Sequence, residues 1–155
     1  MKKIITIFAF FLLYNCGFEP IYSKKNIDNN YNFSINSIGF SGENKINQTI
    51  KNKLLNYLDK KEKIVQLDLT INSTIQKNVT SKSKKGNPET FSIKVIIKVD
   101  ISEVDVLKDS IIFEENFEYK NKSNKFELKL YEKNIQNNLT SEISQKIIEH
   151  LYSLK

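Results

Sequence analysis

The sequence predicts an α+β fold: a two-layer sandwich in which two helices cover one face of a four-stranded, mainly antiparallel sheet. Four segments carry apolar side chains at every second residue, which is the period of a strand buried on one face. Two segments carry apolar residues every three or four positions, which is the period of an amphipathic helix. Their order along the 155 residues is β-α-β-β-β-α, and a two-layer arrangement buries all these apolar faces.

The first strand and the first helix should follow each other directly. From Tyr31 to Ile35 apolar and polar residues alternate, and the phase slips at Ser37, which predicts a bulged strand. The run 41–44 supplies breaking and capping residues for a helix that should end at about Asp59, within a charged run. The apolar stripe of this helix is Ile46, Ile50, Leu54, Tyr57 and Leu58.

The second and third strands should pair in an antiparallel meander. Residues 65–76 and 91–101 each alternate between an apolar and a polar face, as expected for a sheet with one solvated side. The segment between them, Asn78 to Thr90, is polar and contains Gly86 and Pro88. We expect it to form an extended loop.

The C-terminal third should contain the fourth strand and a long helix. After Glu103 the alternation shifts, and the run 108–110 predicts a turn into a strand over 111–119. Asn124, with Glu127 three residues later, has the form of a capping box. The stripe that follows is Leu128, Tyr131, Ile135, Leu139, Ile143, Ile147, Leu151 and Leu154.

The N-terminus has the pattern of a lipoprotein export signal. Lys2 and Lys3 precede an apolar segment at residues 4–13, which as a helix rises about 15 Å, half of a bilayer's roughly 30 Å core. Cys16, the only cysteine, follows it, and its thiol can take a diacylglyceryl group. We therefore predict a signal peptide at 1–15 and acylation of Cys16. An ordinary signal peptide that leaves Cys16 as a free thiol is the alternative.

Three parts should follow from this reading: the signal peptide, a lipidated polar tether at 16–30, and a single domain at 31–155. The net charge of +6 comes from lysines without arginine, a compositional bias that does not indicate a polyanionic partner. Nucleic acid is not expected for an exported chain. One cysteine and one histidine leave no basis for a disulfide or a zinc site, so we expect no cofactor besides the covalent lipid.

No catalytic constellation is evident, and we predict that the protein is not an enzyme. His150 on the last helix has no Ser or Cys partner that the sequence places within reach, and should be a surface or edge histidine. Glu114 and Glu115 are neighbours on a strand and should point to opposite faces, which excludes a paired acid and base. Gly-rich phosphate loops are absent from the sequence.

One short motif resembles a known family. Residues 16–22 read Cys-Gly-Phe-Glu-Pro-Ile-Tyr, which resembles the Cys-Gly-Phe-Arg-Pro-Leu-Tyr start of mature LptE lipoproteins in their alphaproteobacterial branch; Glu19 is the departure. The length and the element order also match that family. The resemblance implies a lipid anchor at the periplasmic face of the outer membrane. It also implies binding inside the LptD β-barrel, help with its assembly, and delivery of lipopolysaccharide to the outer leaflet.

Two surfaces are candidates for such contacts. Lys82, Lys84 and Lys85 could meet lipid A phosphates, or could belong to a solvated loop. An uncharged polar face could meet the lumen of a barrel, or solvent. Its residues include Gln66, Thr70, Asn72, Thr74 and Gln76. A second possible function is a periplasmic carrier of a lipid or glycan, although the bulky helix stripes favour a filled core over a cavity.

Overall fold

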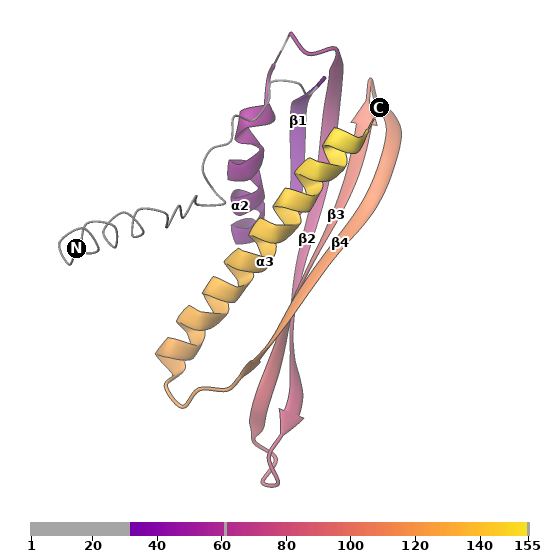
Figure 1. The fold of residues 1–155 in the computed structure, drawn as a ribbon. Coiled ribbons are helices and arrows are strands. Elements are labelled where there is room, and N and C mark those ends of the chain that lie inside the picture. Colours follow the sequence, from indigo (N-terminus) through magenta and orange to yellow (C-terminus); the bar gives the residue numbers. More distant parts are fainter. Residues whose placement is uncertain (1–31, 61, 155) are drawn as a thin grey trace, which may run out of the picture. The chain divides into compact units, whose positions relative to one another are not determined.

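The structure, a computed structural model, describes residues 32–60 and 62–154 (Figure 1). The predicted signal peptide, Cys16 and the tether at 16–30 lie outside the described residues. The elements are β1 (Phe33–Gly42), α2 (Asn44–Leu54), a 3-10 turn (Leu55–Tyr57), β2 (Val65–Lys82), β3 (Pro88–Glu103), β4 (Val106–Lys120) and α3 (Lys125–Ser153). The predicted order β-α-β-β-β-α is confirmed.

The strands form one mixed sheet in the order β1-β2-β3-β4. β1 pairs with β2 in parallel because α2 returns the chain to the same end of the sheet, whereas β2, β3 and β4 are antiparallel and joined by hairpins. Both helices cover the same face of the sheet (Figure 1). The predicted two-layer α+β sandwich is therefore confirmed.

β1 contains the predicted bulge. Ile35 pairs with Leu67 and Ser37 pairs with Asp68, so Asn36 is the extra residue. The Asp68 carboxylate accepts hydrogen bonds from Ser37 Oγ at 2.6 Å and from Asn36 Nδ2 at 2.9 Å. These two bonds, the one from Ser37 first, lower the pKa of Asp68.

α2 is shorter than predicted and ends at Leu54 rather than near Asp59. After the 3-10 turn the backbone pairs with β1: Leu58 bridges to Ile35, Asp59 N donates to the Ile35 carbonyl at 3.0 Å, and Lys60 N donates to Ser34 Oγ at 2.7 Å. These tertiary hydrogen bonds replace the helical ones, so the helix cannot continue.

The predicted loop from Asn78 to Thr90 is wrong. β2 and β3 continue as a two-stranded ribbon in which Asn78 pairs with Ser92 and Lys82 pairs with Pro88. Only residues 83–87 turn, closed by Ser83 N donating to the Asn87 carbonyl at 2.8 Å. The exposed ribbon packs no core, so its sequence lacks the apolar alternation that marks a half-buried strand.

The predicted turn at 108–110 is also wrong. β3 and β4 are joined by Val104 and Asp105, which have φ of 50° and 62°, and Glu103 pairs directly with Val106. A β-branched residue rarely adopts positive φ, so the sequence does not predict a turn at Val104. Lys108 lies in β4 at a register shift, which explains the break in the alternation.

The core is the layer between the helices and the sheet. Both helix stripes are buried as predicted, except that Leu58, Tyr131 and Leu154 are half-buried. The capping box is confirmed: Asn124 Oδ1 accepts from Phe126 N at 3.0 Å and from Glu127 N at 3.2 Å. The fully buried members of the layer include Ile35, Ile50, Leu54, Leu69, Ile71, Ile93, Ile97, Ile101, Ile143, Ile147 and Leu151.

A cluster of hydrogen-bonded polar groups holds the start of α2 against β2. Ser73 Oγ donates to Asn47 Oδ1 at 2.7 Å and accepts from Glu43 N at 2.9 Å. Asn47 Nδ2 donates to the Ser41 carbonyl at 3.1 Å. Gly42 passes between these groups with φ of 86°, and a Cβ there would lie 1.9 Å from the Ser73 carbonyl oxygen.

We predict that Gly42→Ala destabilises the fold far more than Gly86→Ala. Gly86 has nearly the same φ, 82°, but a Cβ there meets nothing within 4 Å. Gly86→Ala should therefore lower the free energy of unfolding by about 1 kcal/mol, the conformational cost alone. Gly42→Ala adds a backbone clash and should cost more than about 3 kcal/mol. Urea unfolding measures both, and equal losses would contradict the close approach to Ser73.

Candidate functional site

The three predicted lysines lie at the tip of the β2–β3 ribbon. Lys82 is the last residue of β2, and Lys84 and Lys85 lie in the turn, so Lys82 is on a strand rather than in the expected loop. All three lysines are solvent-exposed, and none takes part in an ion pair among the described residues. The structure thus gathers the three positive charges at one end of the ribbon.

The open face of the sheet, on the side away from the helices, contains the predicted polar residues of β2. Thr70, Asn72, Thr74 and Gln76 are exposed there, and Gln66 is half-buried because its Nε2 donates to the Lys63 carbonyl at 3.0 Å. These five residues are uncharged, but the same face of the sheet also carries Asp68 on β2 and two ion pairs on the neighbouring strands. They are Lys94–Glu114, with N···O 2.5 Å, and Lys98–Asp100, with N···O 3.0 Å.

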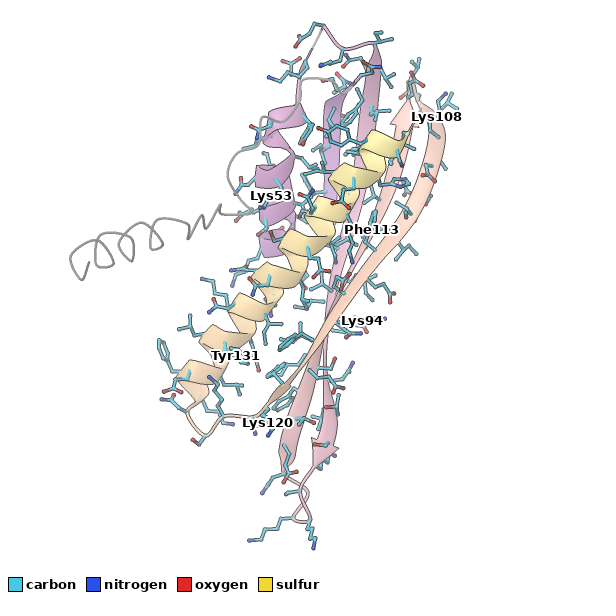
Figure 2. All side chains as sticks on the ribbon, in the orientation of Figure 1. Lys53, Lys94, Lys108, Phe113, Lys120 and Tyr131 are labelled. Atoms are coloured by element: carbon cyan, nitrogen blue, oxygen red, sulfur yellow. The ribbon has the colours of Figure 1, made fainter. Side chains whose placement is uncertain are left out.

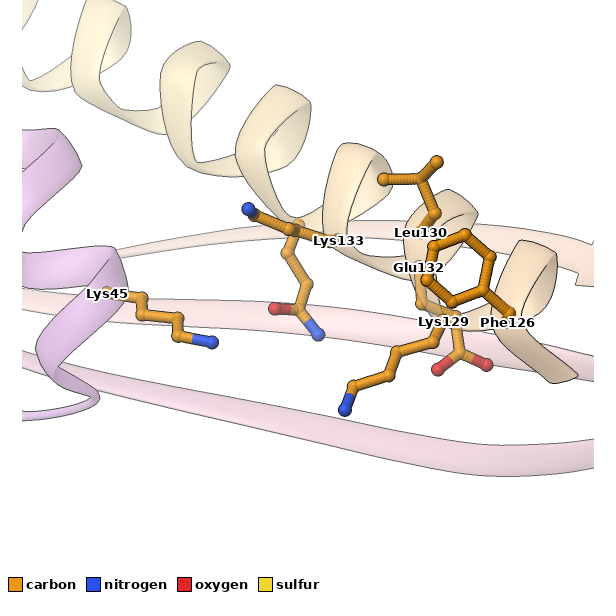
Figure 3. Close-up of a pocket in the computed structure, with 7 residues that line it drawn as sticks. Lys45, Phe126, Lys129, Leu130, Glu132 and Lys133 are labelled. Carbon is orange, nitrogen blue, oxygen red and sulfur yellow. The ribbon is translucent and has the colours of Figure 1, made fainter.

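A groove that the sequence analysis missed lies between the first turns of α3 and the start of α2 (Figure 3). It is open to solvent and encloses about 450 Å³. Lys45 reaches toward it from α2. α3 contributes Phe126, Lys129, Leu130, Glu132, Lys133 and Gln136.

The first turns of α3 present two different faces. Leu128 and Ile135 face the sheet and are buried, whereas Phe126 and Leu130 are 76% and 51% exposed. Phe126 and Leu130 are four residues apart and so lie on one face, next to each other in Figure 3. This spacing was the available signal, because both residues fall outside the stripe that begins at Leu128.

A cluster of polar and aromatic side chains holds this part of α3 to the sheet. The Glu132 carboxylate accepts from Lys77 Nζ at 2.6 Å and from the Tyr119 hydroxyl at 2.8 Å. Lys77 Nζ lies 4.5 Å from the centroid of the Phe91 ring, which stacks on Tyr119. Burial, and then the bond to Glu132, raises the pKa of Tyr119, so the phenol remains a donor.

The acid–base candidates have structural partners. His150 is half-buried beside the edge strand β4, and its Nε2 lies 2.6 Å from Asp109 Oδ2. This hydrogen bond is the main cause that lowers the pKa of Asp109. Glu114 pairs with Lys94 on the open face, whereas Glu115 pairs with Lys146 of α3. The two glutamates therefore point to opposite faces, as predicted.

The described part of the chain contains no group of three or more His, Cys, Asp or Glu side chains that could hold a metal ion. Within residues 32–60 and 62–154, no helix combines the length and the apolar composition that crossing a bilayer requires.

The fold is shared with bacterial lipoproteins. It is similar to rare lipoprotein B from Shewanella oneidensis, with TM-score 0.58 and 12% identity over 76% of this chain and 95% of that one. A minor lipoprotein from Acinetobacter baumannii has TM-score 0.62 and 11% identity over 79% and 92%. Lipoprotein B from Nitrosomonas europaea has TM-score 0.58 and 14% identity over 74% and 79%. No family model and no curated protein sequence matches the chain.

We predict that Glu132→Ala costs more stability than Glu114→Ala. The two Lys–Glu pairs have similar N···O distances, 2.6 and 2.5 Å, but the Glu132 side chain is 16% exposed and that of Glu114 is 46% exposed. Loss of Glu132 also leaves the Tyr119 hydroxyl without its acceptor, so the free energy of unfolding should fall by about 2 kcal/mol. Glu114→Ala should cost less than about 1 kcal/mol. Thermal or urea unfolding of both variants checks this, and a larger loss at Glu114 would refute it.

Proposed function

We propose that the chain is an outer-membrane lipoprotein, anchored through Cys16 at the periplasmic face, that binds inside an LptD-like β-barrel. There it would assist assembly of the barrel and insertion of lipopolysaccharide into the outer leaflet. The observation that carries the proposal is the agreement between two independent features. The motif at 16–22 resembles the start of LptE lipoproteins, and the domain has a fold that solved bacterial lipoproteins share.

The open face of the sheet is the surface that we assign to the barrel. Neither described helix covers it, and its β2 side chains from Thr70 to Gln76 are neutral hydrogen-bonding groups that suit a wet contact with a polar lumen. Its lysines at positions 94 and 98 already have carboxylate partners. Burying such compensated charges costs less than burying unpaired ones.

The lysines of the ribbon tip are the groups that we assign to lipopolysaccharide. Ammonium groups bind phosphate effectively, and Lys82, Lys84 and Lys85 are exposed at the end of a ribbon that projects past the helix-covered part of the sheet (Figure 2). Binding rather than catalysis is the activity we infer.

A periplasmic carrier of a lipid or glycan is the second candidate. The groove of about 450 Å³ with its exposed Phe126 and Leu130 favours it, because an apolar ligand could lie against these side chains. The layer between helices and sheet offers less support, since fully buried aliphatic side chains occupy it. A carrier would not need a stoichiometric barrel partner, which separates the two functions.

Affinity capture from detergent-solubilised outer membranes tests the barrel assignment. The full chain should recover one β-barrel protein in equal amount, and the intact mass of the mature chain should include acyl groups on Cys16. Asn72→Glu with Thr74→Glu should reduce recovery of the barrel by more than tenfold, because the contact would gain two negative charges beyond the two ion pairs that it already contains. Gln48→Glu, on the exposed side of α2, is the control. Full recovery by the double variant would contradict the assignment, and an unmodified thiol would refute the anchor.

Neutralising the ribbon tip tests the assignment to lipopolysaccharide. The Gln variant of Lys82, Lys84 and Lys85 should bind lipopolysaccharide more weakly, with the larger difference at low salt, where exposed charges are less screened. Its melting temperature should stay nearly constant, since the three side chains have no ion-pair partners among the described residues. The matched control changes Lys51, Lys53 and Lys60 to Gln. Unaltered binding by the tip variant, or equal loss in the control, would return these lysines to a solvated hairpin.

A further inference from the structure

Phe126 and Leu130 form an apolar pair on the solvent side of α3. They are 76% and 51% exposed, although the same helix buries Leu128 and Ile135 against the sheet. These two large side chains are adjacent on one helix face and form a continuous exposed apolar patch. An exposed apolar patch with a polar border is a candidate contact with a partner or a membrane.

Lysines border this apolar pair. Lys129 and Lys133 lie on the neighbouring strip of α3, Lys125 begins the same helix, and Lys45 extends toward the groove from α2 (Figure 3). None of these four takes part in an ion pair among the described residues. The acidic side chain in the groove, Glu132, is already engaged by Lys77.

The helix N-terminus itself is not the attracting group. Asn124 Oδ1 accepts from Phe126 N and Glu127 N, and Asn124 Nδ2 donates to Glu127 Oε1 at 3.3 Å. The free backbone donors that make helix starts attractive to anions are thus partly satisfied by the protein. Attraction for an anionic partner comes from the lysine side chains.

We propose that the first three turns of α3 dock the domain on an anionic phospholipid surface. Phe126 and Leu130 enter the boundary between headgroups and acyl chains, while the ammonium groups of Lys129, Lys133 and Lys45 stay with the lipid phosphates. The apolar residues project outward from a helix flanked by long cationic side chains, which is the arrangement of interfacial helices. The proposal does not depend on the barrel partner.

The cluster around Glu132 makes this docking directional. Because Glu132 bonds to both Lys77 of β2 and Tyr119 of β4, the docked segment is tied to the sheet on its inner side. Figure 1 shows that α3 begins toward the same end of the domain as the β2–β3 hairpin. Phe126, near the start of α3, and the ribbon lysines therefore lie toward the same end of the domain.

A single tryptophan provides the test, since the chain has none. The full chain with Phe126→Trp is titrated with phosphatidylcholine vesicles, with or without phosphatidylglycerol, and with lipid A dispersions. Ile112→Trp is the control, because Ile112 is 59% exposed but belongs to the open face of the sheet. A local fluorophore reports this helix segment even where the N-terminal region also binds the vesicles.

We expect a blue shift and quenching by brominated lipid at Trp in position 126, with phosphatidylglycerol present, and neither effect at position 112. Adding Lys129→Gln and Lys133→Gln should raise the lipid concentration at half-saturation about thirtyfold, at about 1 kcal/mol for each lysine. No response at position 126, equal responses at both positions, or equal responses without anionic lipid would overturn the proposal. A response to lipid A alone would also overturn it, in favour of a lipopolysaccharide site.

Discussion

Both helices bury their apolar stripes against one face of the sheet, and this single layer of contacts determines what the other surfaces can do. α3 has 29 residues and α2 has 11, so they extend about 44 Å and about 17 Å. The shorter helix covers β1 and β2, and the first turns of α3 project past it. Those turns pack on the sheet on their inner side, and they border the groove that Lys45 of α2 also lines. The open sheet face exists because both helices lie on one side of the sheet, and the exposed outer side of α3 follows from the unequal helix lengths.

Polar side chains supply the positions that apolar packing leaves undetermined. Ser73 and Asn47 fix where α2 starts, Asp68 holds the bulge of β1, and Glu132 joins α3 to the sheet where the aliphatic layer thins. Each of these groups has hydrogen-bond partners, so none carries the full cost of burial. The aliphatic layer therefore gives the fold its stability, and these hydrogen-bonded polar groups determine how the helices and the bulge are placed on the sheet.

The sequence predicted the parts of the fold in which burial imposes a period. The stripes that contain Ile50 and Ile143 and the alternating strands fall in this class, as does the bulge near Ser37. It failed where no burial exists. The ribbon over 78–90 is held by backbone pairing and by hydrogen bonds among Thr80, Ser81 and Thr90, which impose no apolar period. Val104 lies in a turn that contains no glycine or asparagine. The ribbon lysines could be proposed from charge, but the groove could not, because it depends on how far α3 extends beyond α2.

Charge is distributed differently over the candidate surfaces, and the difference indicates what each can meet. On the open face Lys94 and Lys98 are paired with carboxylates. At the ribbon tip and along the α3 groove, the lysines have no ion-pair partner among the described residues. A surface whose charges are already paired can be buried against a polar protein wall without leaving an unpaired charge in the contact. Ammonium groups without an ion-pair partner, by contrast, can form new ion pairs with an anionic ligand. This pattern favours a protein on the sheet face and phosphate groups at the other two surfaces.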